Sequence, residues 1–203
     1  DRSQKLLLYR DRVGIKPLHY WIRNGTILFA SEIKALLEYP EVSQEISLPA
    51  LSDYLSFLYI PTPKTIYREI LKLPAGHYLR YEAGCAQILP YWDFSYRETH
   101  RLREAEWIER LREKLRESIR THLVSDVPLG AFLSGGTDSS AVVAWMSRET
   151  NQPVRTYSIG FRDDRLNELD YAGEVARHFE TNHHEKMVEV NAFELLPKII
   201  SGF

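Results

Sequence analysis

The stretch Leu129-Gly130-Ala131-Phe132-Leu133-Ser134-Gly135-Gly136-Thr137-Asp138-Ser139-Ser140 decides the fold of the second half of the chain. Its apolar start, 129–133, predicts a short strand, the glycine pair predicts a tight turn, and a helix is expected over about 138–149. The alternation continues downstream, with strand, helix and strand predicted at 154–161, 168–179 and 185–190. Because strands alternate with helices, the sequence predicts a parallel sheet covered by helices.

The turn 134–140 has the composition of an anion-binding site. Glycine permits backbone conformations and close approaches that a Cβ would forbid, and the free amides at the start of the next helix point at whatever occupies the turn. Serine and threonine hydroxyls add neutral donors, so a polyphosphate could be held without a lysine. The helix dipole supplies only about half a charge. A divalent cation is therefore needed, and Asp138 offers the nearby hard oxygen ligand for Mg²⁺.

Spacing excludes three other motifs at this turn. A Walker A loop needs a lysine where Thr137 stands, and a dinucleotide fingerprint needs three spaced glycines. The nucleophile elbow of hydrolases needs a glycine where Phe132 stands. One alternative stays open, in which serine and Asp138 only cap the helix while the two glycines make the turn.

The first hundred residues are strand-rich and predict an antiparallel arrangement with a few helices. Asn24-Gly25 predicts a tight hairpin turn between two of the strands. Ser31 is expected to cap a short helix, and a second helix is expected over 48–59. The predicted strands are 6–9, 18–22, 26–30, 76–82 and 86–91.

A change of pattern marks a domain boundary between about 94 and 104. From Glu104 to Leu123, apolar residues recur every three or four positions in a highly charged stretch, which predicts a long amphipathic helix. Strand-rich sequence precedes this helix, and alternating strands and helices follow it. We therefore expect two domains, 1–96 and 97–203, of which the first is α+β and the second α/β.

The composition is that of a globular protein, with 203 residues, 44% hydrophobic and 27% charged. The net charge of −2 gives no basic surface for general nucleic-acid binding, and no apolar run reaches the ~20 residues of a membrane helix. A single cysteine excludes an internal disulfide, and the sequence starts without a secretory-signal pattern. These features predict a cytoplasmic protein with no nucleic-acid or membrane partner.

Three further features favour structural roles. Cys85 is expected to be a small buried or half-buried residue. His183 and His184 are adjacent on a predicted strand, so their side chains point to opposite faces and no metal site is expected. Aromatic residues at helical spacing predict core packing rather than a ligand cage, namely Tyr54, Phe57 and Tyr59.

The segment 125–140 resembles the ATP-pyrophosphatase loop of glutamine-dependent asparagine synthetases. It departs from that family at Thr137, where an aliphatic residue is usual. Upstream, the chain resembles the closing half of the family's glutaminase domain at 10–18, 29–36 and 73–77. Downstream, the next landmarks of the family are matched in order at 157–161, 168–172 and 182–185. The resemblance covers nearly the whole chain.

The resemblance implies a fold and a reaction. Residues 1–96 would be the C-terminal part of an N-terminal-nucleophile glutaminase domain. Residues 97–203 would begin a parallel-sheet ATP-pyrophosphatase domain of the adenine nucleotide α-hydrolase type. Such enzymes are ligases that use ATP to adenylate the side-chain carboxylate of aspartate, release pyrophosphate, and let glutamine-derived ammonia displace AMP to give asparagine. The expected cofactors are ATP and Mg²⁺.

The same resemblance assigns the site residues. Asp138 would be both the metal ligand and the catalytic residue. Leu133 and Ile159, at the ends of adjacent strands, would meet the adenosine. Pyrophosphate and its Mg²⁺ would be held by Ser134, Gly135, Gly136, Asp138, Ser139 and Ser140.

Two other functions stay open beside asparagine synthesis. One is a related amidotransferase acting on another carboxylate, such as a cell-envelope sugar acid or a β-lactam precursor, and the other is a non-catalytic nucleotide-binding remnant. The family's glutaminase uses an N-terminal cysteine and this sequence starts at Asp1, so we expect an internal fragment that is inactive alone. The glutaminase nucleophile and the aspartate pocket would lie outside it. Expected partners are ATP, aspartate and ammonia, with a homodimer as the assembly to test.

Overall fold

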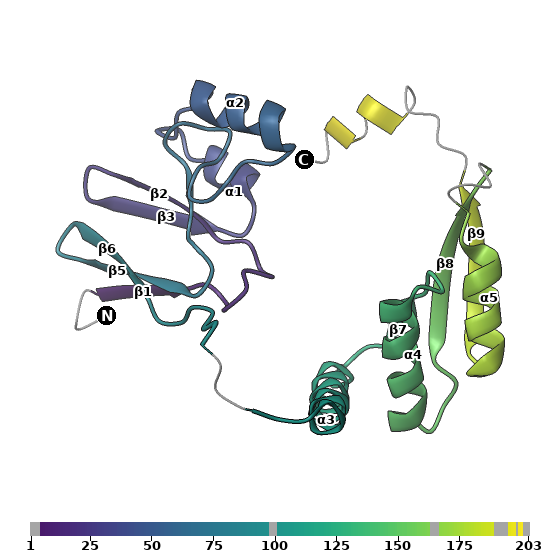
Figure 1. Ribbon diagram of the computed structural model, residues 1–203. Coiled ribbons are helices and arrows are strands. Elements are labelled where there is room, and N and C mark those ends of the chain that lie inside the picture. Colours follow the sequence, from purple (N-terminus) through teal and green to yellow (C-terminus); the bar gives the residue numbers. More distant parts are fainter. Residues whose placement is uncertain (1–4, 98–100, 163–166, 189–194, 198, 201–203) are drawn as a thin grey trace. The chain divides into compact units, whose positions relative to one another are not determined.

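The computed structural model describes residues 5–97, 101–162, 167–188, 195–197 and 199–200. By their internal contacts, the residues form two compact units, Asp1–Arg97 and Glu98–Phe203 (Figure 1). No helix among the described residues is long and apolar enough to cross a membrane.

The first unit contains two antiparallel sheets. One has the order β1-β5-β6, formed by β1 (Lys5–Tyr9), β5 (His77–Glu82) and β6 (Cys85–Pro90). The other has the order β3-β2-β4, formed by β2 (His19–Arg23), β3 (Thr26–Ala30) and β4 (Leu71–Lys72). The five predicted strands are confirmed, with ends that differ by at most one residue. The strand β4 was not predicted, because a strand of two residues has no recognisable hydrophobic period.

The predicted Asn24-Gly25 hairpin is confirmed. Arg23 pairs with Thr26 across the turn, and both turn residues have positive φ, 49° for Asn24 and 74° for Gly25. Two consecutive left-handed residues are the requirement of a two-residue hairpin turn whose twist matches that of the strands.

Alternation along β2 builds the core of the first unit on both faces of one strand. Tyr20 points between the two sheets and packs with Leu8 and Leu79. Trp21 points to the other face, where it packs with Leu36 of α1 (Ile33–Leu37) and with Ile70. The unit is therefore layered as sheet, sheet and helix.

Two helix predictions for this unit need correction. The N-cap of α1 is Glu32, with no side-chain hydrogen bond at the cap, so the prediction that Ser31 caps this helix is wrong. The second helix, α2 (Leu48–Phe57), is capped by Ser47, whose hydroxyl accepts from the amide of Ala50, and it ends at Leu58 in the left-handed conformation. It is therefore shorter than the predicted span.

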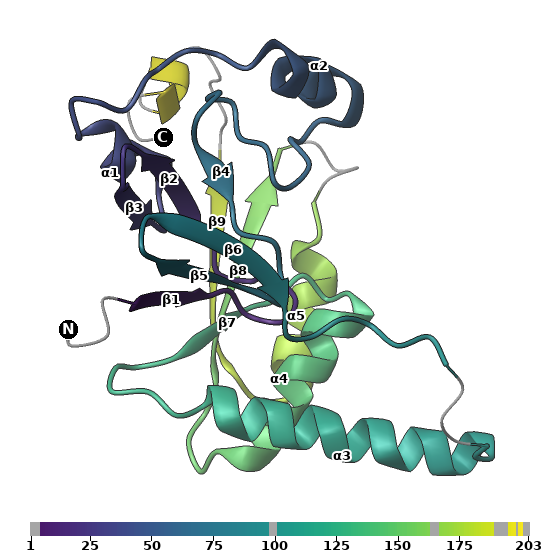
Figure 2. The ribbon, with the colours of Figure 1, turned by 90° about the vertical axis from the view of Figure 1, so that its left-hand side faces the viewer.

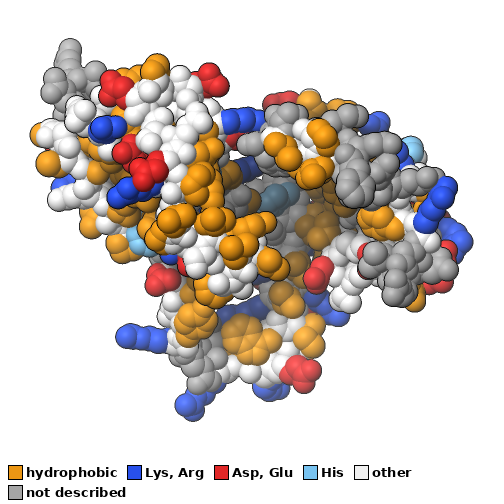
Figure 3. All heavy atoms as spheres, turned by 90° about the horizontal axis from the view of Figure 1, so that it is seen from above, with side chains coloured by type: hydrophobic (Ala, Val, Ile, Leu, Met, Phe, Trp, Pro, Cys, Tyr) orange, Lys and Arg blue, Asp and Glu red, His pale blue; other side chains and the backbone are white. Residues whose placement is uncertain are grey.

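The aromatic side chains of α2 and the segment after it are exposed, so the prediction that they form core is wrong. Tyr54, Phe57 and Tyr59 are 48%, 58% and 62% exposed. In α2 only Ala50 is buried. Figure 3 looks down on this end of the unit and shows hydrophobic side chains at the surface among charged ones. Spacing places residues on one helix face, but it does not determine whether anything covers that face.

The second unit is a parallel α/β structure, as the alternation predicted (Figure 2). Its sheet has the order β7-β8-β9, and each strand is parallel to the next. The predicted strand at 185–190 begins three residues earlier, and residues 189 and 190 lie outside the described residues. In chain order the elements are α3 (Glu104–His122), β7 (Gly130–Phe132), α4 (Thr137–Glu149), β8 (Arg155–Phe161), α5 (Leu169–His178) and β9 (Asn182–Val188).

Within the described residues, helices cover one face of this sheet rather than both. Residues of α4 and α5, Val143, Ala172 and Ala176, pack around Leu133 in a buried cluster. Along β8 the even-numbered residues 156, 158 and 160 are buried, whereas Tyr157 and Ile159 are 39% and 49% exposed. α3 packs beside α4, where Ile119 meets Met146.

Candidate functional site

The chain leaves β7 through Leu133, which stays attached to β8 although it lies past the last paired residue of β7. The amide of Leu133 donates to the carbonyl of Tyr157 at 2.9 Å. The hydroxyl of Ser158 donates to the carbonyl of Leu133 at 2.5 Å. The Leu133 side chain is only 2% exposed and belongs to the buried cluster between sheet and helices. Leu133 therefore fixes the point at which the turn begins.

The two glycines of the turn differ in backbone conformation and in the space around them. Gly135 has a φ of +77°, and a Cβ on it would lie 2.5 Å from the backbone carbon of Tyr171 in α5. Only glycine satisfies both constraints at this position. Gly136 has a φ of −70°, and a Cβ there would meet nothing closer than the Ser134 hydroxyl at 3.4 Å. Glycine was expected to be required at both positions. By backbone conformation and by the space available for a Cβ, it is required only at Gly135.

Two serines close the turn on itself. The hydroxyls of Ser134 and Ser139 lie 3.0 Å apart. Ser139 Oγ accepts from the Ser134 amide at 3.3 Å and donates to the Gly136 carbonyl at 3.2 Å. Ser134 Oγ accepts from the Gly136 amide at 3.3 Å. These hydroxyls already hold the turn together, so they would have to exchange partners to reach a ligand.

The first turn of α4 has backbone amides that no side chain caps. Its N-cap is Gly136, which brings no side chain, so the first-turn amides of Thr137, Asp138 and Ser139 are not capped by a side chain. The Ser140 hydroxyl is buried and has no partner among the described residues. A buried hydroxyl without a partner is uncommon and calls for an explanation, such as a ligand or an ion.

Asp138 does not cap this helix. It is the second residue of α4, two positions after the N-cap, and it makes no cap hydrogen bond. The alternative in which Asp138 serves as the cap is therefore wrong. Its side chain is exposed in the first turn, where the positive end of the helix dipole favours a carboxylate.

The donor set suits an anion that shares a divalent cation with the protein. The amides and hydroxyls of the turn are donors for phosphate oxygens, and Asp138 is a hard ligand for Mg²⁺. The described residues contain no group of three or more His, Cys, Asp or Glu that could hold a metal ion. Mg²⁺ bound here would therefore need ligands from the anion and from water as well as from Asp138.

Ile159 lies across from the turn on β8, at the same end of the sheet. The carbonyl of Tyr157 accepts from the amide of Leu133. The backbone N–H and C=O groups of the odd-numbered residues of β8 therefore point toward β7. The pairing of β7 with β8 stops at Phe132 and Tyr157, so the backbone of Ile159 faces the edge past the end of β7. Ile159 therefore has both its backbone and an exposed side chain at this end of the sheet. The side chain of Leu133, by contrast, is buried.

The side chains of His183 and His184 lie on opposite faces of β9, as predicted. His183 Nδ1 lies 2.8 Å from Thr156 Oγ1, and its Nε2 lies 3.2 Å from Glu185. The ring of His184 stacks on Tyr157 with centroids 5.1 Å apart. Cys85, by contrast, is exposed, so the prediction of burial is wrong. It closes the β5–β6 hairpin opposite Glu82, where side chains project into solvent.

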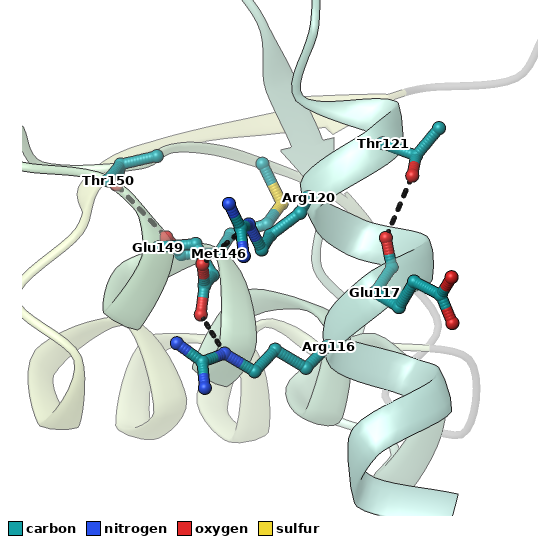
Figure 4. Close-up of polar contacts among 7 residues, drawn as sticks. All are labelled: Arg116, Glu117, Arg120, Thr121, Met146, Glu149 and Thr150. Carbon is teal, nitrogen blue, oxygen red and sulfur yellow. Dashed lines mark hydrogen bonds and ion pairs between the residues drawn. The ribbon is translucent and has the colours of Figure 1, made fainter.

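At the opposite end of α4, polar groups are paired with two arginines of α3 and with the C-cap residue Thr150 (Figure 4). The carboxylate of Glu149 accepts from Arg116 at 2.6 Å and lies 3.5 Å from Arg120, both on α3. Thr150 contributes its amide and its hydroxyl to the carbonyl of Met146, at 3.1 and 3.0 Å. The ion pair between Arg116 and Glu149 could not be predicted from local sequence patterns, because it joins residues thirty-three positions apart.

Ser158 and Tyr171 were also missed as parts of the site. Ser158 holds the entry to the turn, and Tyr171 backs Gly135. The available signal was the row of small residues at alternate positions of β8, Thr156, Ser158 and Gly160, which marks a face approached closely by other backbone.

Comparison with known proteins identifies two family matches along the chain. The family described as "Asparagine synthase" matches residues 110–202, and the family described as "Glutamine amidotransferase domain" matches residues 1–92. Together they account for both units.

The chain also aligns with individual relatives along most of its length. The chain is similar to asparagine synthetase (glutamine-hydrolyzing) 1 of Bacillus subtilis, with 33% identity over 96% of this chain and 30% of the relative. It is similar to a putative asparagine synthetase (glutamine-hydrolyzing) 2 of Methanocaldococcus jannaschii, with 34% identity over 97% of this chain and 39% of the relative. It is also similar to amidase chry2 of Gibberella zeae, with 36% identity over 76% of this chain and 23% of the relative.

The chain thus spans between 23% and 39% of the length of these relatives. The two family matches occur in sequence, with an amidotransferase part followed by a synthase part. From these matches and from the relatives that align over nearly all of its residues, the chain belongs to the asparagine synthetase family.

Proposed function

We propose that the full-length protein is an ATP-dependent amide-forming ligase of the glutamine-hydrolysing asparagine synthase type. In this reaction the side-chain carboxylate of aspartate attacks the α-phosphorus of ATP and pyrophosphate leaves. Ammonia derived from glutamine then attacks the acyl carbon, AMP leaves, and asparagine forms. The names of the relatives support this activity.

The observation that carries the proposal is the surplus of donors at the start of α4. Three kinds of group gather where a strand of the parallel sheet passes into a helix. They are the uncapped amides, the Ser140 hydroxyl, which has no partner among the described residues, and the exposed Asp138 carboxylate. Open α/β sheets bind ligands at this end of their strands. A pyrophosphate with Mg²⁺ would use each of these groups.

Each residue has a proposed role. Gly135 lets the turn pass close to α5, and Gly136 leaves the helix start open for phosphate oxygens. Asp138 holds Mg²⁺, which when bound would neutralise charge on the departing pyrophosphate. Ser134, Ser139 and Ser140 donate to the phosphates, and Leu133 and Ile159 mark where the adenosine would lie.

The finer fold assignments belong to the same proposal. We assign residues 1–96 to an N-terminal-nucleophile glutaminase domain and residues 97–203 to an adenine nucleotide α-hydrolase-like domain. The paired antiparallel sheets of the first unit and the parallel sheet of the second support these assignments. We propose a cytoplasmic location, in keeping with a single cysteine.

A different acceptor is the second candidate. The similarity to a protein named an amidase favours considering amide chemistry on carboxylates other than aspartate. The turn of the second unit would serve either acceptor, because it would contact ATP rather than the acceptor.

The test is exchange of labelled pyrophosphate into ATP by the full-length protein, with a panel of carboxylates. We expect exchange that requires Mg²⁺ and aspartate. Exchange with another carboxylate alone would select the second candidate, and no exchange with any member of the panel would contradict the ligase proposal.

A further inference from the structure

The peptide group between Leu133 and Ser134 is held at both of its polar atoms. Its oxygen accepts from Ser158 Oγ at 2.5 Å, and its nitrogen donates to Ser139 Oγ at 3.3 Å. Because a peptide group is planar, fixing both atoms fixes the direction in which the chain enters the turn. One anchor lies on α4, inside the turn, and the other lies on β8, outside it.

The β8 anchor replaces a backbone bond. If the parallel ladder continued past Tyr157, the carbonyl of Leu133 would accept from the amide of Ile159. Pairing stops at Phe132 instead, and the Ser158 side chain takes the Leu133 carbonyl. The chain can therefore leave the sheet without a buried acceptor losing its partner.

Water cannot easily substitute for this hydroxyl. Ser158 is 6% exposed and Leu133 is 2% exposed, and the bond is buried. Removing the hydroxyl would leave the carbonyl without a donor in an apolar cluster, which favours rotation of the peptide toward another partner. Rotation at this point would be transmitted to Gly135, which has a φ of +77° and no room for displacement toward Tyr171.

We propose that Ser158 is a positioning residue that sets the orientation of the turn 134–136 through the carbonyl of Leu133. The identity of the ligand, Mg-ATP, rests on the proposed function. The effect of Ser158 on the turn does not depend on that function. Ser158 acts through Leu133 and is assigned no contact with ATP.

The experiment compares Ser158→Ala with Thr156→Val in the full-length protein. Thr156 is the matched control, because it lies on the same buried face of β8 and bonds to Thr181 and His183 rather than to the turn. Hydrogen exchange of the amides at 134–136 is measured without nucleotide, and the Kd for Mg-ATP is measured separately. Thermal unfolding of both variants reports the general cost of losing a buried hydroxyl.

We expect Ser158→Ala to accelerate exchange at 134–136 and to raise the Kd for Mg-ATP about five- to tenfold, the scale of one buried hydrogen bond. Thr156→Val should change neither. Ser158→Cys keeps a weak donor on a somewhat larger side chain, so it should give intermediate values. It serves in place of Ser158→Ala if that variant does not fold.

Exchange and Kd at wild-type values in Ser158→Ala would overturn the proposal, as would equal effects in Ser158→Ala and Thr156→Val. The exchange measurement separates this proposal from the proposed function. Faster exchange at 134–136 in Ser158→Ala alone supports the positioning role even if the wild-type protein binds no Mg-ATP, a result that would count against the proposed function.

Discussion

The two ends of α4 differ in how their polar groups are satisfied. At the C-terminal end, Glu149 is paired with two arginines and Thr150 bonds twice to the carbonyl of Met146. At the N-terminal end, the cap brings no side chain and the buried Ser140 hydroxyl has no partner among the described residues. One helix thus has an end built for stability and an end whose donors remain available.

The difference shows which end can carry function. The helix dipole disfavours a carboxylate in the last turn, where Glu149 lies. The two arginines of α3 compensate for this unfavourable interaction. At the other end, the dipole itself favours the carboxylate of Asp138, which makes no cap hydrogen bond. Substitutions at the N-terminal end should therefore change ligand binding more than stability, and substitutions at the C-terminal end should do the reverse.

The largest effect is expected for Asp138→Asn. The variant removes the charge that we propose holds Mg²⁺ but removes no cap, since Asp138 is not the cap of α4. Pyrophosphate release by the full-length enzyme at saturating ATP, Mg²⁺ and aspartate should fall by about a hundredfold or more, with an unchanged melting temperature. Ser140→Ala is the milder neighbouring control. Near-normal turnover in a folded Asp138→Asn protein would remove the metal role.

Gly135→Ala should reduce stability and binding together. A Cβ would lie 2.5 Å from the Tyr171 backbone at a residue with φ of +77°, so the turn must move away from α5. The left-handed conformation and the clash together should cost about 2–4 kcal/mol of unfolding free energy, measured by chemical denaturation. Gly136→Ala is the matched control and should retain stability to within about 1 kcal/mol. Equal losses in both variants would contradict the distinction between the two glycines.

Glu149→Gln should affect stability alone. Its side chain is 11% exposed, while those of Arg116 and Arg120 are 56% and 67% exposed, so solvent screens part of the attraction. We expect a loss of about 1–2 kcal/mol and unchanged pyrophosphate release. Glu117→Gln breaks an exposed pair with Lys114 and should cost less stability than Glu149→Gln. A fall in turnover without a fall in melting temperature would show that the C-terminal end is not purely structural.

The smallest effect is expected for Cys85→Ala. The thiol is exposed on a hairpin in the first unit, far in sequence from both ends of α4. Glutamine hydrolysis and pyrophosphate release by the full-length protein should stay at wild-type values. Loss of glutaminase activity in this variant would assign Cys85 a role that its surroundings do not suggest.

Local patterns predicted most of the elements. The period of 3–4 residues predicted α3, and the Asn24-Gly25 pair predicted a hairpin whose residues have positive φ. The glycine-rich turn was placed correctly between a strand and a helix. These features depend on residues close in sequence, where propensity and spacing are informative.

Features that depend on distant residues could not be predicted in this way. The role of Ser158 follows from the register that pairs Phe132 with Tyr157, and the need for glycine at 135 follows from the position of Tyr171. The exposure of Tyr54 depends on what covers α2, which spacing does not encode. The assignment of the turn to pyrophosphate and Mg²⁺ stays a prediction.

The most direct test of the contrast between the two ends of α4 is hydrogen exchange of the full-length protein with and without Mg-ATP, read by mass spectrometry. The peptide spanning 133–141 should be protected several-fold by Mg-ATP, and the peptide spanning 146–152 should not change. Protein saturated with Mg-ATP that shows no added protection at 133–141 would contradict the account.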